Sequence, residues 1–246
     1  MMAIAVLFAA CGAARSAQTG GPRYGLHLHR DGSSLPMSAA RGIAKVVVLV
    51  HGLDEPGTIW RALIPELEAE GFTVCEFTYP NDQRIRLSSI HLAAELEAAR
   101  QSGLQRIDLV AHSMGGLVCR ELLTSPGIEQ ASLPRVDRLI MVGTPNHGSD
   151  LVRFRVLAEA RDQVIRLYNG ERLWMSAFAD GGGEAAEDLV PGSAFLTELN
   201  ARQLPITVAV SIIAGDASPV RAQTASDLIA WLRSHGYGSD DDLINW

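Results

Sequence analysis

Residues 107–124 read Ile-Asp-Leu-Val-Ala-His-Ser-Met-Gly-Gly-Leu-Val-Cys-Arg-Glu-Leu-Leu-Thr, an apolar run followed by a small-residue turn and a helical pattern. This order predicts a strand, a sharp turn and a helix, with Ser113 at the apex of the turn. Small neighbours let strand and helix approach closely and leave the serine hydroxyl exposed above the sheet edge. The usual motif is Gly-x-Ser-x-Gly, and Ala111 stands in place of its first glycine. We therefore predict that Ser113 is a nucleophile, the alternative being a Ser/Gly-rich turn without a chemical role.

A second informative strand end precedes this turn. The run Lys45–Val50 is rich in β-branched residues, which suits a strand buried on both faces, and it ends in His51-Gly52-Leu53. Attack by a serine on an ester creates a negatively charged oxygen, which needs preorganised hydrogen-bond donors. The segment is typical of a loop that supplies one such donor, the alternative being a simple turn at a strand end.

Together these segments resemble the α/β-hydrolase superfamily, and within it the secreted bacterial lipases and the lipase-like proteins related to GPI inositol-deacylases. The resemblance extends roughly from Lys45 to Trp246. Two further segments, in the order found in that lipase group, also carry it: Gly143-Thr144-Pro145-Asn146-His147-Gly148-Ser149, and Asp188-Leu189-Val190-Pro191-Gly192-Ser193 with Phe195-Leu196. The resemblance implies an α/β-hydrolase fold, with a mainly parallel sheet flanked by helices and a cap insertion between strands six and seven.

The resemblance also implies a reaction, namely hydrolysis of carboxylic esters through an acyl-enzyme on Ser113. The backbone amides of Leu53 and Met114 would form the oxyanion hole. The expected partner is a small-molecule ester or lipid substrate, and no cofactor or metal is implied. Two alternatives stay open: an acyltransferase of the same fold, and a catalytically inactive binding protein.

The acid of the implied triad follows the serine along the chain. The segment Asp240-Asp241-Asp242-Leu243-Ile244 resembles the Asp-Gly-Leu-Val segment that carries the acid in bacterial lipases, which makes Asp241 the expected acid. Asp242 and Asp216 are the alternatives, and three adjacent aspartates are also typical of a solvated acidic turn.

The histidine base is expected to follow the acid. We expect the sequence to end before the last strand and its histidine, because Trp246 comes so soon after the predicted acid. The alternative base is His235, which also suits an ordinary helix C-terminus. We expect His51 and His112, beside the oxyanion and nucleophile positions, to have structural roles.

Strands and helices alternate along the chain, which favours a mainly parallel sheet covered on both sides, with its loops of interest at the carboxyl ends of the strands. We expect an edge strand at Tyr24–Leu28 and a linker at Asp31–Met37. The further expected strands are Lys45–Val50, Thr73–Thr78, Ile107–Ala111, Arg138–Val142 and Ile206–Ala214, and the expected helices include Thr58–Glu70 and Leu87–Ser102.

Residues 151–202 interrupt this alternation and are the expected cap or lid within a hydrolase domain of residues 21–246. Trp174 and Phe178 are spaced to share a helix face and are the expected substrate contacts. The other apolar residues of the segment are expected to form the core of the cap, and Gly181-Gly182-Gly183 would permit it to move.

Composition agrees with one globular domain. The chain has 246 residues, of which 47% are hydrophobic, and its net charge of −7 comes without a basic stripe, so nucleic acid is not an expected partner. The sequence leaves the oligomeric state open. Cys75 and Cys119 are predicted to be buried free thiols.

Residues 1–20 are interpreted as an export leader, although they lack a positively charged start, so an apolar tail is the alternative. Phe8-Ala9-Ala10-Cys11 resembles a bacterial lipoprotein cleavage site. We therefore expect an exported protein (periplasmic, secreted or an outer-membrane lipoprotein), with association with a membrane surface as one option.

Overall fold

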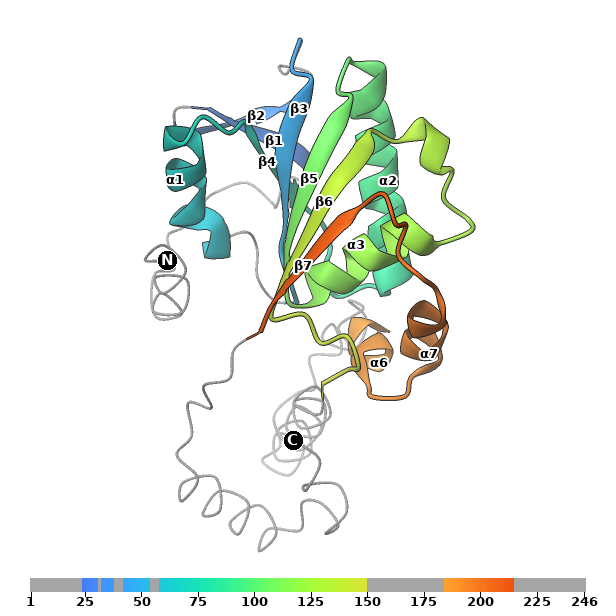
Figure 1. The fold of residues 1–246 in the computed structure, drawn as a ribbon. Helices are drawn as coiled ribbons and strands as arrows, with labels where there is room; N and C mark the ends of the chain where they lie inside the picture. Colours follow the sequence, from blue (N-terminus) through green and yellow to red (C-terminus); the bar gives the residue numbers. More distant parts are fainter. Residues whose placement is uncertain (1–23, 31, 38–41, 54–57, 150–183, 215–246) are drawn as a thin grey trace, which may run out of the picture. The chain divides into compact units, whose positions relative to one another are not determined.

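In the computed structural model, residues 24–30, 32–37, 42–53, 58–149 and 184–214 are described. Within these ranges seven strands form one sheet in the order β2-β1-β4-β3-β5-β6-β7 (Figure 1). The strands are β1 Gly25–Arg30, β2 Ser33–Pro36, β3 Lys45–Val50, β4 Val74–Thr78, β5 Arg106–His112, β6 Arg135–Val142 and β7 Ala209–Ile213. Strands β4, β3, β5, β6 and β7 are parallel, and β1 runs antiparallel to both β2 and β4. The predicted, mainly parallel sheet is confirmed.

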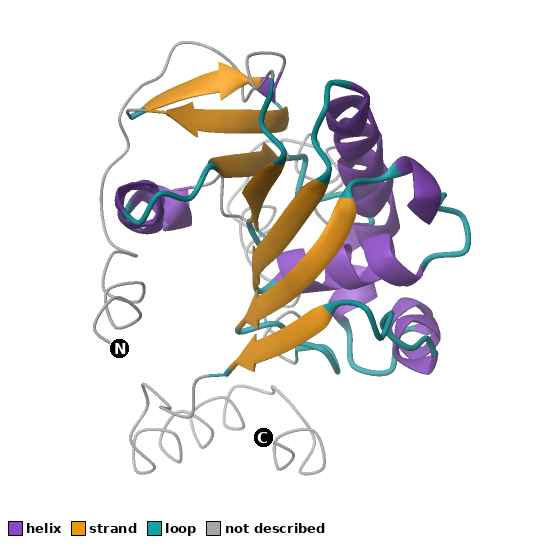
Figure 2. Cartoon of the chain, turned by 45° about the horizontal axis from the view of Figure 1, so that its top comes forward, coloured by secondary structure: helices purple, strands orange, loops and turns teal. Residues whose placement is uncertain are grey.

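Helices cover both faces of this sheet (Figure 2). They are α1 Leu63–Ala69, α2 Ile85–Gln101, α3 Met114–Thr124, α6 Glu184–Leu189 and α7 Ala194–Ala201, with short 3-10 helices η3 Thr58–Arg61 and η4 Gln130–Ser132. Successive side chains of a strand point to opposite faces. Val46, Val48 and Val50 of β3 accordingly join the core with α2 and α3, whereas Val47 and Leu49 pack with residues of η3 and α1. Burial on both faces explains the apolar run of β3.

Two expectations about the first part of the chain are wrong. The predicted linker at 31–37 contains β2, whose Leu35 pairs with Leu28 and packs against the core. Strand β1 is therefore an inner strand, because it pairs with β2 on one side and β4 on the other.

The predicted helix Thr58–Glu70 is divided into η3 and α1. Pro65 explains the division, because it has no N–H to donate to the carbonyl of Arg61 and its ring would collide with that carbonyl in a continuous helix. The α-helix instead begins at Leu63, which places Pro65 in its first turn, where no N–H is needed.

Cys75 and Cys119 are buried free thiols, as predicted. Burial raises the pKa of Cys75 to about 12 and also raises the pKa of Cys119. Both thiols are therefore protonated near neutral pH and are poor nucleophiles.

Residues 184–202, the described part of the expected cap, pack into the main core. Leu189, Phe195, Leu196 and Leu199 of α6 and α7 belong to the same buried cluster as α2 and α3. The remainder of the expected cap lies outside the described residues, as do the expected export leader and everything after Ala214. Among the helices in the described ranges, none has the length and apolar character needed to cross a membrane.

Candidate active site

Ser113 stands between β5 and α3, at the strand, turn and helix that the sequence predicted. Its backbone has φ 51° and ψ −127°, and within the described ranges it is the only non-glycine residue with a positive φ. Such a conformation costs of order 1–3 kcal/mol and persists only where its surroundings hold it. Two hydrogen bonds do so, because Ser113 N donates to Val142 O at 2.9 Å and Gly116 N donates to Ser113 O at 3.1 Å.

The Ser113 turn packs directly on the end of β3. A Cβ added to Gly115 would lie 2.5 Å from the carbonyl oxygens of both Val50 and His51. A Cβ added to Gly52 would lie 2.8 Å from Ser113 Cβ and 3.4 Å from Ser113 Oγ. Only glycine permits such close backbone approach at these two positions. The structure therefore brings together the two segments that the sequence singled out.

A hydrogen-bond network holds the loop after β3. His51 is buried, and its Nδ1 lies 2.9 Å from Gly52 O. Because a carbonyl oxygen only accepts, Nδ1 carries the proton in this contact. Asn81 Nδ2 donates to the same oxygen at 3.2 Å, and Tyr79 Oη donates to His51 O at 2.7 Å. The Tyr79 and His51 rings also stack, with centroids 4.4 Å apart. These contacts agree with the structural role expected for His51.

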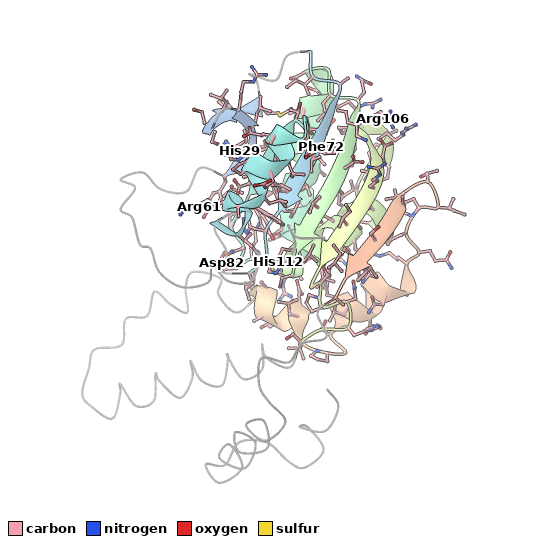
Figure 3. The ribbon with its side chains drawn as sticks, turned by 60° about the vertical axis from the view of Figure 1, so that its left-hand side comes forward. His29, Arg61, Phe72, Asp82, Arg106 and His112 are labelled. Atoms are coloured by element: carbon pink, nitrogen blue, oxygen red, sulfur yellow. The ribbon has the colours of Figure 1, made fainter. Side chains whose placement is uncertain are left out.

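The two predicted oxyanion donors border this contact. Met114 is the first residue of α3, where helix geometry leaves N–H groups without intrahelical partners and places the positive end of the helix dipole. Leu53 directly follows Gly52 and packs against the core. Figure 3 shows His112, the last residue of β5, at the same end of the sheet as Asp82, which lies in the loop after β4.

The segments that follow β6 meet helix α3. Thr144 lies against Gly116, where an added Cβ would collide with Thr144 Oγ1. Arg120 Nη1 donates to Asn146 Oδ1 at 2.8 Å, and Ser149 N donates to Leu189 O at 3.0 Å. The Gly-Thr-Pro segment and the segment from Asp188 to Ser193 therefore contact each other beside the Ser113 helix.

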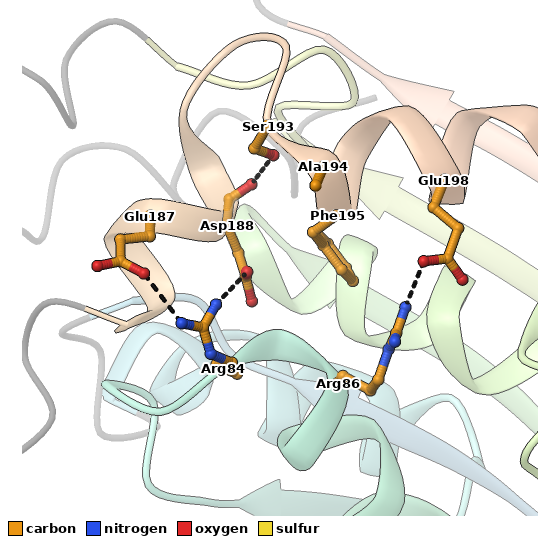
Figure 4. A pocket seen from close by; sticks show the side chains of 8 residues that line it. All are labelled: Arg84, Arg86, Glu187, Asp188, Ser193, Ala194, Phe195 and Glu198. Carbon is orange, nitrogen blue, oxygen red and sulfur yellow. Dashed lines mark hydrogen bonds and ion pairs between the residues drawn. The ribbon is translucent and has the colours of Figure 1, made fainter.

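Charged residues gather around a pocket of about 380 Å³ between the start of α2 and helices α6 and α7 (Figure 4). Arg84 pairs with Glu187 at 3.0 Å and Asp188 at 3.3 Å, and Arg86 pairs with Glu198 at 2.9 Å. Glu121 of α3 is fully buried and accepts from Arg86 and Arg202. These arginines are neutralised by carboxylates, which favours a structural role for the cluster.

Within the described ranges, no three His, Cys, Asp or Glu side chains are placed to hold a metal ion.

Several predicted site residues fall outside the described ranges. They are the expected substrate contacts Trp174 and Phe178, the expected acid Asp241 with its alternatives Asp216 and Asp242, and the alternative base His235. Two residues that contact the site were missed from the sequence, Tyr79 and Asn81. The available signal was their position directly after β4, because carboxyl ends of neighbouring parallel strands meet at one edge of the sheet.

Comparison with solved structures identifies the fold as that of the α/β-hydrolases. The lipase BlEst2 of Bacillus licheniformis in its mature form superimposes with a TM-score of 0.53 at 18% identity, over 80% of this chain and 76% of that one. The phospholipase PlaB of Legionella pneumophila gives a TM-score of 0.51 at 17% identity, over 72% of this chain and 40% of that one. At such identities the likeness concerns the fold, and the expected α/β-hydrolase architecture is confirmed.

Comparison at the level of sequence says less about this chain than comparison of structures does. The model of a domain of unknown function, DUF7379, matches residues 89–190, which include the Ser113 turn. No curated protein matches the chain.

Proposed function

We propose that this protein is a serine hydrolase that cleaves carboxylic esters through an acyl-enzyme on Ser113. The observation that carries the proposal is the strained, positive-φ backbone of Ser113, placed at the start of α3 and against Gly52. Strain of this kind concentrates at functional sites, and a serine on such a turn presents its hydroxyl at the sheet edge. An α/β-hydrolase fold adds to the proposal only by analogy, since one fold hosts many functions.

In the proposed reaction Ser113 Oγ attacks the ester carbonyl carbon while a histidine base takes its proton. The carbonyl oxygen becomes negative and is stabilised by the N–H groups of Leu53 and Met114. The bond to the alcohol then breaks, the alcohol leaves with the proton, and water releases the acid from the serine. Asp241 is the proposed acid that orients the base, and it lies outside the described residues.

The finer part of the proposal concerns the substrate. The lipase and phospholipase named among the similar structures support a lipid or other acyl ester as the substrate. An acyltransferase would use the same acyl-enzyme and differ only in the acceptor, so an assay with added alcohol distinguishes the two reactions.

Replacing Ser113 with alanine tests the nucleophile. Loss of a triad serine costs on the order of 10⁶ in kcat where the full machinery operates, so Ser113→Ala is expected to abolish turnover of p-nitrophenyl esters and labelling by a fluorophosphonate probe. The matched control is Ser102→Ala, which removes an exposed hydroxyl that donates to Ala98 O at the end of α2. This control is expected to keep parental activity and labelling.

Labelling of the Ser113→Ala variant at the parental level would overturn the assignment. Mass spectrometry of the labelled parent is expected to place the probe on Ser113. A higher kcat/KM for an octanoate than for an acetate ester would support the lipid part of the proposal, because each buried methylene contributes roughly 0.8 kcal/mol.

A further inference from the structure

We propose that Asn81 is a positioning residue, which orients the Gly52–Leu53 peptide so that the Leu53 N–H faces the substrate oxygen. This inference rests on the proposed function and adds to it a residue from a different strand. Asn81 lies in the loop after β4, whereas the peptide it contacts follows β3.

The argument begins with the carbonyl of Gly52. Its oxygen accepts from Asn81 Nδ2 at 3.2 Å and from His51 Nδ1 at 2.9 Å. A peptide unit is planar and trans, so its N–H points opposite to its C=O. With the Gly52 oxygen held toward Asn81 and His51, the Leu53 N–H is directed away from both of them.

Glycine makes such anchoring necessary. Gly52 has no room for a Cβ, since one would lie 2.8 Å from Ser113 Cβ, and glycine has the widest backbone freedom of any residue. An oxyanion donor is effective only when its direction is set before the reaction. The bonds to the Gly52 carbonyl therefore help to set the direction of this peptide.

The two anchors differ in what fixes them. His51 is adjacent to the peptide and is buried against Tyr79, which donates to His51 O and stacks on the ring. Asn81 follows Pro80, whose ring limits φ, and the loop starts from a strand that is in register with β3 through the pair Val50 and Phe77. Asn81 thus holds the peptide from the loop after β4, whereas His51 holds it from the end of β3.

Asn81→Asp is the informative substitution. It keeps the size of the side chain and replaces the N–H₂ donor with a carboxylate, which repels the Gly52 carbonyl instead of binding it. At acid pH the carboxyl is protonated and regains one O–H donor. A defect caused by the lost donor is therefore relieved toward acid pH, whereas a packing defect is not.

The experiment measures kcat and KM of parent and variant for a p-nitrophenyl ester across pH. We expect Asn81→Asp to lower kcat about tenfold to a hundredfold at neutral pH with little change in KM, somewhat less than the 10²–10³ lost with an oxyanion donor itself. The ratio of variant to parent kcat is expected to rise below about pH 5, as the new carboxyl is protonated.

Gln130→Glu is the matched control. Gln130 Nε2 donates to a backbone carbonyl, Leu122 O, at 2.7 Å, so this variant also exchanges a carboxamide donor for a carboxylate. Leu122 lies about 13 Å along α3 from Ser113, from the rise of an α-helix. The control is expected to keep the parental kcat and pH profile.

Crystal structures of parent and Asn81→Asp separate this inference from the proposed function. The parent is expected to keep Gly52 O on Asn81, and the variant to show that carbonyl turned away. An unchanged carbonyl together with an unchanged kcat would overturn the inference while leaving the role of Ser113 intact. A parent that neither turns over esters nor is labelled at Ser113 contradicts the proposed function, and the carbonyl orientation then still decides whether Asn81 sets the peptide.

Discussion

The two ends of strands β3, β5 and β6 are built in contrasting ways. At their carboxyl ends backbone packs against backbone, with Gly115 directly on the carbonyls of Val50 and His51. At their amino ends charges gather: Lys45, Arg106 and Arg135 all donate to Asp137, at 3.2, 2.7 and 2.9 Å, and Lys45 also contacts Asp108 at 2.9 Å.

The contrast separates two ways of ending a sheet. Close packing fixes atoms firmly but leaves no space for an added methyl group. Ion pairs whose cations are exposed to solvent hold atoms less firmly, are screened by water and tolerate substitution. The carboxyl end, where the proposed chemistry needs fixed geometry, is the close-packed one. Stability measurements on substitutions at the two ends test this difference.

The largest effect is expected for Gly115→Ala. Helix propensity alone predicts a gain of up to about 1 kcal/mol, because alanine is the best helix former. The added Cβ would instead lie 2.5 Å from two backbone carbonyl oxygens, neither of which belongs to a flexible side chain. We therefore expect the free energy of unfolding, measured in urea, to fall by about 3 kcal/mol.

Gly127→Ala is the control for that prediction. The nearest atom to its added Cβ is Ser125 Oγ at 3.8 Å, an ordinary contact, so a change within about 0.5 kcal/mol is expected. Equal stability of the two variants would mean that the carboxyl end is not close-packed around Gly115.

A smaller effect is expected at Asp188, a charged anchor at the carboxyl end. Asp188 is buried and accepts from Ile85 N, in the first turn of α2, at 2.9 Å. Asp188→Ala leaves that N–H unsatisfied and is expected to cost about 1–2 kcal/mol, whereas Asp188→Asn keeps an acceptor and is expected to cost less.

Glu187 provides the comparison within the same cluster. It also pairs with Arg84, at 3.0 Å, but its side chain is 67% exposed against 7% for Asp188. Glu187→Gln is expected to change stability by no more than about 0.5 kcal/mol. A loss as large as that of Asp188→Ala would show that the ion pair, and not the helix cap, stabilises this region.

Sequence reasoning found the parts of the site that are local in the chain. The Ser113 turn and the end of β3 are each determined by a few adjacent residues, and the strand, turn and helix appear where expected. The division between η3 and α1 was missed, although its signal, Pro65, is local as well. The contact of Asn81 with Gly52 has no local signal, because it depends on which strands become neighbours, and Tyr79-Pro80-Asn81 alone has the composition of an ordinary turn.

Strand β2 illustrates the same limit. Its segment contains residues typical of loops, namely Gly32, Ser33, Ser34 and Pro36. It forms a strand because β1 offers an edge to pair with, and as the outer strand of the sheet β2 tolerates the missing N–H of a proline. Pairing with a distant segment therefore overrides local composition.

The amino end supplies the smallest and most pH-dependent effect. Although burial raises the pKa of Asp137, hydrogen bonds from Arg106, Lys45 and Arg135 outweigh it and lower the pKa to about 2, from an ordinary value of 3.8. A carboxyl with a lowered pKa in the folded state stabilises the fold above its unfolded pKa, and that contribution is lost as pH falls from about 4 to about 2. The arginine side chains are at least half exposed, so we expect about 1 kcal/mol.

Asp137→Asn is therefore expected to lower stability by about 1 kcal/mol at pH 6 and to approach the parent near pH 2, measured by urea unfolding at several pH values. Asp188→Asn is the control with the opposite sign. Burial raises the pKa of Asp188, so its folded form binds the proton more tightly than the unfolded form, and this group favours folding less as pH rises above 3.8. Asp188→Asn is therefore not expected to reduce the loss of stability that protonation of Asp137 causes at acid pH. If Asp137→Asn leaves the pH dependence between 4 and 2 unchanged, its ion pairs do not stabilise the amino end, and the contrast between the two ends reduces to packing alone.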